Sequence, residues 1–411
     1  MRRSNAPSAK FTAAIILTAS LFAVWGLGLR LYDTLLPQFA KVFELHSYEL
    51  ALTQSVYSIV YFLGAIPAAL YARRFGYKAA ILFGLGSFCV GAFILYPAAE
   101  TRVFPYFLFA ATVMASGWLV LEIAANPLAA CLGSVETSVW RLNVAQSFFP
   151  LGALVGTFCG NWIVSSNLAL PVERFTRSIV HPYILVGVGM LVLAYLVDIA
   201  RFPPVATERI RGLRGAAGEF RALLTNRLFL FGIVAQFFSV LALAGTWSLC
   251  GRFTGAAFMG NVFLWSLAVF AAGRVFGSTL MARVEPDRLL AVFACGGLIL
   301  AAVAALAGEP VGVIAMVASS FFLSIIWPTV LGISIRGLGP LMKLGTALVC
   351  MGGAVGGFAY QMLNVAWTFP SANLAMVVPV ISYAAVLAFA VVSERVRKTA
   401  VTCPVTTTET V

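Results

Sequence analysis

Charged side chains are scarce in this 411-residue chain. Asp, Glu, Lys and Arg together make up only 10% of the residues, whereas 61% are hydrophobic; an ordinary soluble domain carries about 25% charged residues. So few charges cannot cover the surface of a water-soluble protein, and the mean hydropathy of +0.96 points the same way. The composition therefore predicts a polytopic membrane protein.

Patterns that bind metals or form disulfides are also missing. The chain has 2 histidines, and none of its 7 cysteines forms a CxxC pair. This spacing favours neither a zinc site nor a disulfide framework, and the apolar segments contain no nucleophile–base pair or metal cluster. We therefore expect no metal, no cofactor and no catalytic residue, and the chain is not predicted to be an enzyme.

Long apolar segments fill most of the chain. A helix needs about 20 mostly apolar residues to cross a bilayer, which predicts an all-α membrane protein with twelve transmembrane helices in two six-helix halves. The predicted segments are 11–33, 51–72, 79–98, 104–132, 143–165, 182–202, 228–250, 261–282, 288–307, 310–335, 345–367 and 372–393.

The two halves are joined by an Arg-rich stretch. We assign 1–202 to the N-terminal half, 203–227 to a basic cytoplasmic connector in contact with membrane lipid, 228–398 to the C-terminal half and 399–411 to a disordered tail. Parallel repeats of this kind are typical of transporters whose halves rock about a central site.

Most of the 27 Lys and Arg residues fall on the side of the predicted helices that holds both ends of the chain, and Arg274 is counted with them. Lys and Arg collect on the cytoplasmic side of membrane proteins, so both termini are predicted to be cytoplasmic. The net charge of +12 is then a topology signal, and no nucleic-acid partner is expected.

One turn of the fourth segment concentrates polar residues at membrane depth. A carboxylate such as Glu122 costs roughly 2.5–3.5 kcal/mol at mid-membrane, which favours a protein interior, a partner or a bound proton. Asn126 lies four residues on, on the same helix face, and Pro127 leaves the carbonyl of Ile123 without its helical partner. The alternative is a single tolerated polar residue that faces another helix.

A second acid, Asp33, lies near the outer end of the first segment. Arg30 is three residues earlier and close enough on one helix face to pair with it. Pairing would favour the ionised form of Asp33, whereas burial alone would favour the protonated form. A purely structural ion pair is the alternative to a role in proton transfer.

Three motifs carry a resemblance to a known family. Residues 31–39 read LYDTLLPQF, residues 121–127 read LEIAANP and residues 141–146 read RLNVAQ. Together they resemble the fucose:proton symporter (fucose permease) family of the major facilitator superfamily, and Gln236, Trp247 and Arg274 lie in stretches that extend the similarity into the second half. The resemblance implies a transporter of the bacterial inner membrane that takes up a sugar such as fucose or a related hexose with a proton.

The resemblance also implies the site. In the family, the acids that match Asp33 and Glu122 couple protons, and here Arg30 is the charge partner of Asp33. Trp247 is expected to give an apolar platform for the sugar ring. A monomer, with the proton as coupling ion, is expected to bind sugar through Glu122, Asn126, Asn143, Gln146, Gln236 and Trp247.

Departures from the family pattern leave the substrate open. Arg30 falls in a stretch where the family is rich in asparagine, and Phe149 and Leu243 replace polar residues. Buried hydroxyls of fucose would lack partners in such a site, and Arg30 could accept a sugar acid or simply neutralise Asp33. Two alternatives remain: a proton-driven exporter of amphipathic small molecules with a more apolar cavity, and a receptor or scaffold that does not transport.

Overall fold

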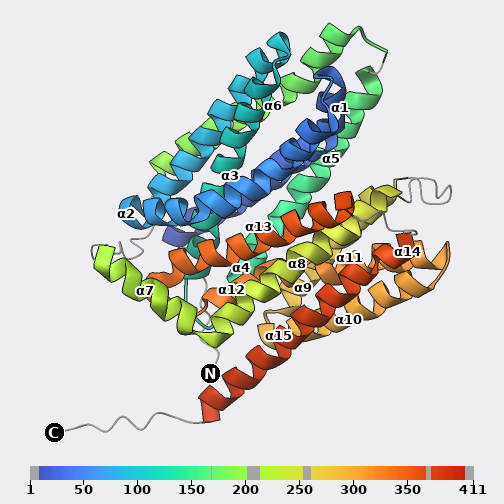
Figure 1. Cartoon of the computed structure of the whole chain (residues 1–411). Helices are drawn as coiled ribbons and strands as arrows, with labels where there is room; N and C mark the ends of the chain where they lie inside the picture. Colours follow the sequence, from blue (N-terminus) through green and yellow to red (C-terminus); the bar gives the residue numbers. More distant parts are fainter. Residues whose placement is uncertain (1–8, 168, 201–212, 253–260, 367–371, 403–411) are drawn as a thin grey trace.

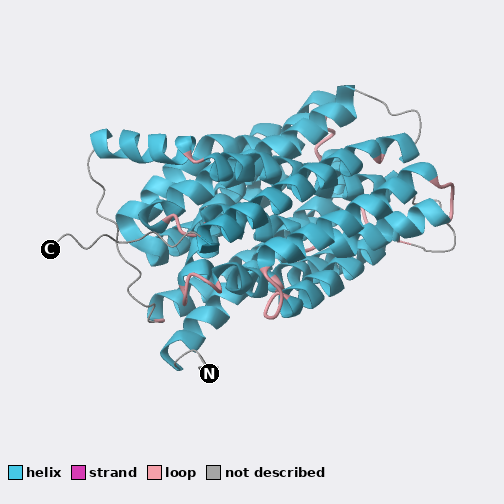
Figure 2. Ribbon diagram, turned by 90° about the horizontal axis from the view of Figure 1, so that it is seen from below, coloured by secondary structure: helices cyan, strands magenta, loops and turns pink. Residues whose placement is uncertain are grey.

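The computed structural model describes residues 9–167, 169–200, 213–252, 261–366 and 372–402, which form helices and short connections (Figures 1 and 2). The first half contains α1 (Ala9–Val42), α2 (Ser47–Thr101), α3 (Phe104–Cys131), α4 (Ser138–Gln146), α5 (Phe148–Asn167) and α6 (Val172–Ile199). The second contains α8 (Arg227–Arg252), α9 (Val262–Leu280), α10 (Pro286–Leu306), α11 (Val311–Leu323), α12 (Ile326–Ile335), a 3₁₀ turn (Gly339–Leu341), α13 (Met342–Ala366), α14 (Ala372–Ala375) and α15 (Val377–Thr402).

These helices account for the predicted transmembrane segments. The described residues contain 11 helical segments that are long and apolar enough to span a membrane. The segment Tyr48–Thr101 is 54 residues long and holds two predicted spans, separated at Gly76, whose φ of +89° a residue with a side chain rarely adopts. The expected all-α, twelve-span fold is therefore confirmed.

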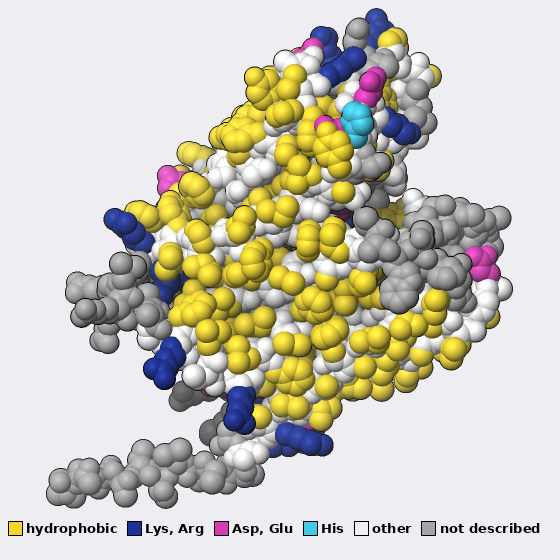
Figure 3. Space-filling model, viewed as in Figure 1, with side chains coloured by type: hydrophobic (Ala, Val, Ile, Leu, Met, Phe, Trp, Pro, Cys, Tyr) yellow, Lys and Arg dark blue, Asp and Glu magenta, His cyan; other side chains and the backbone are white. Residues whose placement is uncertain are grey.

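The surface agrees with a membrane setting. Hydrophobic side chains cover the middle of the face seen in Figure 3, and Lys and Arg gather towards its ends. Among the many large apolar side chains that remain exposed are Leu185, Phe158 and Trp162. Apolar patches of this extent are unusual on soluble monomers, because contact between apolar side chains and water is unfavourable. In a membrane these side chains contact lipid tails instead of water.

The same pair of helices packs backbone against backbone in each half. α1 contacts α5, and α8 contacts α13, so the first and fifth spans of each half are partners. A β-carbon at Gly152 would collide with the carbonyl oxygen of Ala23, and one at Gly356 would collide with that of Phe237. Only glycine permits so close an approach.

The connector is helical where the structure describes it. α7 (Leu213–Thr225) places Glu219 against the buried Arg73 at the end of the second span, with 2.7 Å between Oε2 and Nη1. Residues 203–212 of the predicted connector lie outside the described residues. At the other end α15 continues past position 399 to Thr402, and residues 403–411 of the predicted tail lie outside them too.

The two halves meet on the side of the molecule where α1 begins and α15 ends (Figure 1). The Cys131 sulfur lies 3.5 Å from that of Met342, and the Lys343 ammonium sits 4.4 Å from the centre of the Tyr77 ring. Each contact joins a residue of the first half to one of the second. The interface is therefore closed on the side of the termini.

A methyl group at the α1–α5 contact should destabilise the protein. Gly152→Ala forces its β-carbon into the Ala23 carbonyl, and overpacking of this kind costs about 1–3 kcal/mol. We expect a melting temperature several degrees below that of the wild type in detergent. Gly189→Ala is the control, because its β-carbon would meet nothing within 4 Å; equal losses in both variants would contradict the packing described.

Candidate functional site

A large cavity lies between the two halves. Its volume is about 1000 Å³, at the upper end of the range for small-molecule sites. The lining residues of α1 run from Trp25 to Pro37 and those of α8 from Ser239 to Ser248, which are the parts of both helices far from the closed interface. The cavity therefore extends from mid-depth towards the side away from the termini.

Glu122 of α3 lies at the inner wall of this cavity with only 3% of its surface exposed. Its Oε1 accepts a hydrogen bond from the Cys350 thiol of α13 at 3.3 Å, whereas Oε2 accepts no hydrogen bond of the usual length from the described residues. Among the described residues no cation pairs with it. A carboxylate in such surroundings is costly while it is charged and inexpensive once it carries a proton.

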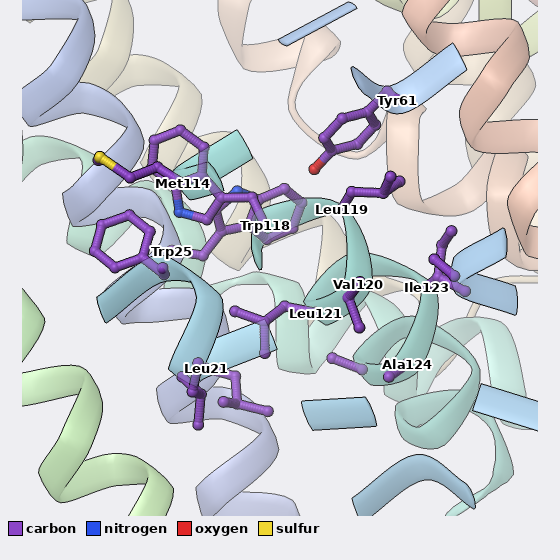
Figure 4. Close-up of a cluster of buried hydrophobic side chains, with 14 of the residues drawn as sticks. Leu21, Trp25, Tyr61, Met114, Trp118, Leu119, Val120, Leu121, Ile123 and Ala124 are labelled. Atoms are coloured by element: carbon purple, nitrogen blue, oxygen red, sulfur yellow. The ribbon is translucent and has the colours of Figure 1, made fainter. Parts of the chain in front are cut away.

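Two tyrosines of α2 complete the surroundings of Glu122. The rings of Tyr57 and Tyr61 stack with their centres 4.0 Å apart, and both side chains interact with the carboxylate. The Tyr61 hydroxyl has no hydrogen-bond partner within the usual distance, and Figure 4 shows it directed towards α3, near Trp118. Protonated Glu122 thus stands beside hydroxyl groups that can either donate or accept.

Asp33 and Arg30 of α1 form an ion pair nearer the open end. The distance between Oδ2 and Nη1 is 2.7 Å. Asp33, expected from the sequence to be buried, keeps 44% of its side chain exposed because it faces the cavity. Its charge is therefore compensated by a partner on the same helix and by access to water.

Arg30 also reaches across to the second half. Its guanidinium carbon lies 4.2 Å from the centre of the Trp247 ring of α8, a geometry in which a cation is attracted to the ring face. The predicted sugar platform is thus covered on one face by a cation. A sugar that stacks on that face of Trp247 would have to displace Arg30.

A chain of amides links α3 to the second half. Asn126 donates from Nδ2 to the backbone carbonyl of Glu122 at 3.0 Å and accepts from Nε2 of Gln146 at 2.7 Å. The Gln146 oxygen then accepts from Nη1 of Arg274 at 3.2 Å. Glu122, Gln146 and Arg274 line the cavity, and Asn126 holds Gln146 in place from behind the wall.

Three predicted sugar-binding residues do not reach the cavity. Asn126, Asn143 and Gln236 are completely buried and are absent from its lining. The Asn143 oxygen accepts from Thr329 of α12 at 3.3 Å, so Asn143 joins the two halves. Neither side-chain polar atom of Gln236 has a hydrogen-bond partner in the part of the chain that the structure describes.

Arg274 does not lie on the termini side, where the sequence predicts it. It lies inside α9 with 3% exposure and lines the cavity. The signal was available, because a charge inside an apolar segment is as costly for Arg as for Glu. No sequence pattern marks Tyr57, Tyr61 and Cys350 as neighbours of Glu122, since a single aromatic or thiol side chain in an apolar segment is typical of ordinary helix packing.

Comparison with known proteins places the chain among transporters. No family model matches it. The L-fucose-proton symporter of Escherichia coli (strain K12) is 30% identical over 93% of each chain, and the glucose/galactose transporter of Brucella abortus is 29% identical over 91% of this chain and 92% of its own. The crystal structure of the major facilitator transporter FucP in its outward conformation superimposes with a TM-score of 0.85 at 29% identity, over 93% of this chain and 99% of that one.

The fold has two similar six-helix bundles, and the cavity between them has a buried carboxylate in its wall. These features define a secondary transporter of the major facilitator superfamily, not an enzyme. The 30% identity with the L-fucose-proton symporter over nearly the whole length also identifies the family within this superfamily. The chain belongs to the fucose:proton symporter family.

The direction in which the cavity opens can be checked with engineered cysteines. Asn161 of α5 is exposed in the cavity, whereas Val139 is fully buried against Gly332 at the closed interface. In intact cells, Asn161→Cys should react with a membrane-impermeant thiol reagent well above the wild-type background, and Val139→Cys should not. Labelling of Val139→Cys alone would mean that the cavity faces the other side.

Proposed function

We propose that the protein takes up a hexose-sized sugar together with a proton across the bacterial inner membrane, with both termini in the cytoplasm. The observation that carries this proposal is Glu122, a carboxylate without a cationic partner in the wall of a sugar-sized cavity. The names of the similar proteins, L-fucose-proton symporter and glucose/galactose transporter, support sugar as the substrate class.

Glu122 is the proton carrier in this proposal. While the cavity is open to the outside, water reaches it and can deliver a proton. The protonated carboxyl is neutral, so the halves can close over it without burying an uncompensated charge. Its O–H then donates to a sugar hydroxyl, and the loss of the proton to the cytoplasm removes that donor and releases the sugar.

Asp33 has the supporting role. Its ion pair with Arg30 at 2.7 Å keeps its charge compensated through the cycle, and the contact of Arg30 with Trp247 ties the pair to the second half. Movement of α8 relative to α1 therefore changes the surroundings of Asp33. In this way Asp33 responds to closure while Glu122 carries the proton.

Switching to the inward state requires the contacts on the termini side to open. They are mostly single, neutral ones: Ser147 Oγ lies 2.9 Å from Ser278 Oγ, and Asn143 accepts from Thr329. Each hydrogen bond of this kind contributes only about 0.5–1.5 kcal/mol. The protein works as a monomer in this scheme, because one chain holds both halves and the whole cavity, and lipid surrounds its apolar belt.

The export of amphipathic molecules is the second candidate. Phe149 and Leu243 line the cavity in place of polar groups that a sugar would bind. Efflux of such compounds from loaded cells, without a response to any sugar, would favour it over uptake.

Glu122→Gln should separate sugar binding from proton movement. Glutamine keeps the size of the side chain and cannot take up or release a proton. In weakly buffered, de-energised cells, addition of the substrate should make the medium alkaline with the wild type and leave it unchanged with the variant. Sugar counterflow between the two sides should persist, since it needs no net proton transfer.

The matched control is Glu136→Gln. Glu136 lies in the exposed loop after α3, where its own backbone amide and Ser134 lower its pKa, so it stays ionised at neutral pH and should not matter for coupling. Retention of sugar-dependent alkalinisation in Glu122→Gln would overturn the assignment of Glu122 as proton carrier.

A further inference from the structure

We propose that the ends of α2 and α6 on the side where the cavity opens bind the phosphate group of an anionic phospholipid. The two helices run side by side (Figure 1). Their ends frame a pocket of about 570 Å³ that is lined by Arg102, Arg174 and Arg177 and by the acid Glu100. No residue that lines this pocket also lines the sugar cavity, so the inference does not depend on the function proposed above.

Lys and Arg residues are few on this side of the molecule. α2 begins and ends there because the chain reverses at Gly76. Outside the cavity, the cations of this side are Lys41, Arg102, Arg174, Arg177 and Arg252. In the predicted topology it is the side where Lys and Arg are least expected, yet three of them meet at one pocket. Topology alone does not account for such a cluster.

The pocket has an excess of positive charge. Glu100 is the only described acid in its lining, and its Oε1 accepts a hydrogen bond from Nε of Arg177 at 2.9 Å. Among the side chains that the structure describes, no carboxylate forms an ion pair with Arg102 or Arg174. Like charges around one pocket repel each other, and guanidinium groups match phosphate oxygens well. A bound phosphate would therefore relieve the repulsion.

The length of α6 places the pocket at the depth of lipid headgroups. The apolar segment Arg174–Ile199 has 26 residues, which at 1.5 Å per residue is roughly 39 Å. The hydrocarbon core of a bilayer is only about 30 Å thick, and the headgroup layers bring the total to about 40–45 Å. The first turns of α6, with Arg174 and Arg177, therefore lie among the headgroups.

An aromatic pair beside the pocket supports this depth. The rings of Tyr96 of α2 and His181 of α6 stack with their centres 6.4 Å apart and their planes at 13°. They lie about two helical turns from Arg102 and Arg174, respectively, on the membrane side of the pocket. Tyrosine rings collect where the hydrocarbon core meets the headgroups. The arginines are thus one step further out, at the level of the phosphates.

The face of α6 beneath Arg174 favours a lipid over a soluble anion. Leu185 and Val192 follow Arg174 by 11 and 18 residues, which brings all three to one face of a helix with 3.6 residues per turn. Leu185 is 72% exposed and Val192 54% exposed. The acyl chains of a lipid with its phosphate at Arg174 would cover this face, whereas a soluble phosphate would leave it bare.

Lipid binding to the full-length protein tests the proposal without any sugar. The protein is immobilised in mild detergent and titrated with radiolabelled dioleoyl phosphatidylglycerol or dioleoyl phosphatidylcholine. These lipids have the same acyl chains and one phosphate each, but only the first has a net negative charge. We expect phosphatidylglycerol to bind with an apparent Kd lower by about tenfold or more.

Arg174→Gln and Lys41→Gln form a matched pair of variants. Each removes one exposed cation from the same side, but only Arg174 lines the pocket. Arg174→Gln should weaken the binding of phosphatidylglycerol about fivefold, and Arg102→Gln/Arg174→Gln about twentyfold. Lys41→Gln should leave it unchanged. Both arginines are exposed, so the melting temperature of each variant should stay at the wild-type value.

Three outcomes would overturn the proposal. One is equal affinity for the two lipids, and another is unchanged binding of phosphatidylglycerol in Arg102→Gln/Arg174→Gln. The third distinguishes a lipid from a free anion: if inorganic phosphate at millimolar concentration displaces the bound phosphatidylglycerol, the pocket is a site for soluble phosphate and not for a lipid.

Discussion

The cost of an uncompensated charge away from water is the constraint on which the rest of this structure depends. It explains why Asp33 stands three residues after Arg30 and why the buried Arg73 contacts Glu219. Glu122 and Arg274, both in the wall of the cavity, have no partner of opposite charge among the described residues. One carboxyl group is left without a cation at the place where the two halves meet. Because a proton can remove its charge, the same constraint that shapes the fold provides the coupling in the cycle we propose.

Much of the fold could be predicted because lipid imposes a simple rule. Apolar stretches of about 20 residues are readable without tertiary information, and the turn at Gly76 was the only place where two predicted spans became one described helix. The pairing of Arg30 with Asp33 was equally accessible, since three residues along a helix bring two side chains to one face.

The wall of the cavity was less predictable, because it depends on which face of each helix meets the other half. Asn126, Asn143 and Gln236, which the sequence predicts as sugar ligands, are buried and absent from the cavity lining in this structure. Arg274, which the sequence predicts at a helix boundary, faces the cavity. The contact of Arg30 with Trp247 joins residues of different halves. Contacts of that range leave no trace in local sequence patterns.

The glycine contacts between α1 and α5 and between α8 and α13 have a mechanical consequence. Where a backbone rests directly on a neighbouring carbonyl, no side chain at that contact can change rotamer to accommodate a displacement. Any deformation must concentrate in the side-chain contacts between the bundles. Each of these helix pairs is therefore expected to move as one unit when the halves rearrange.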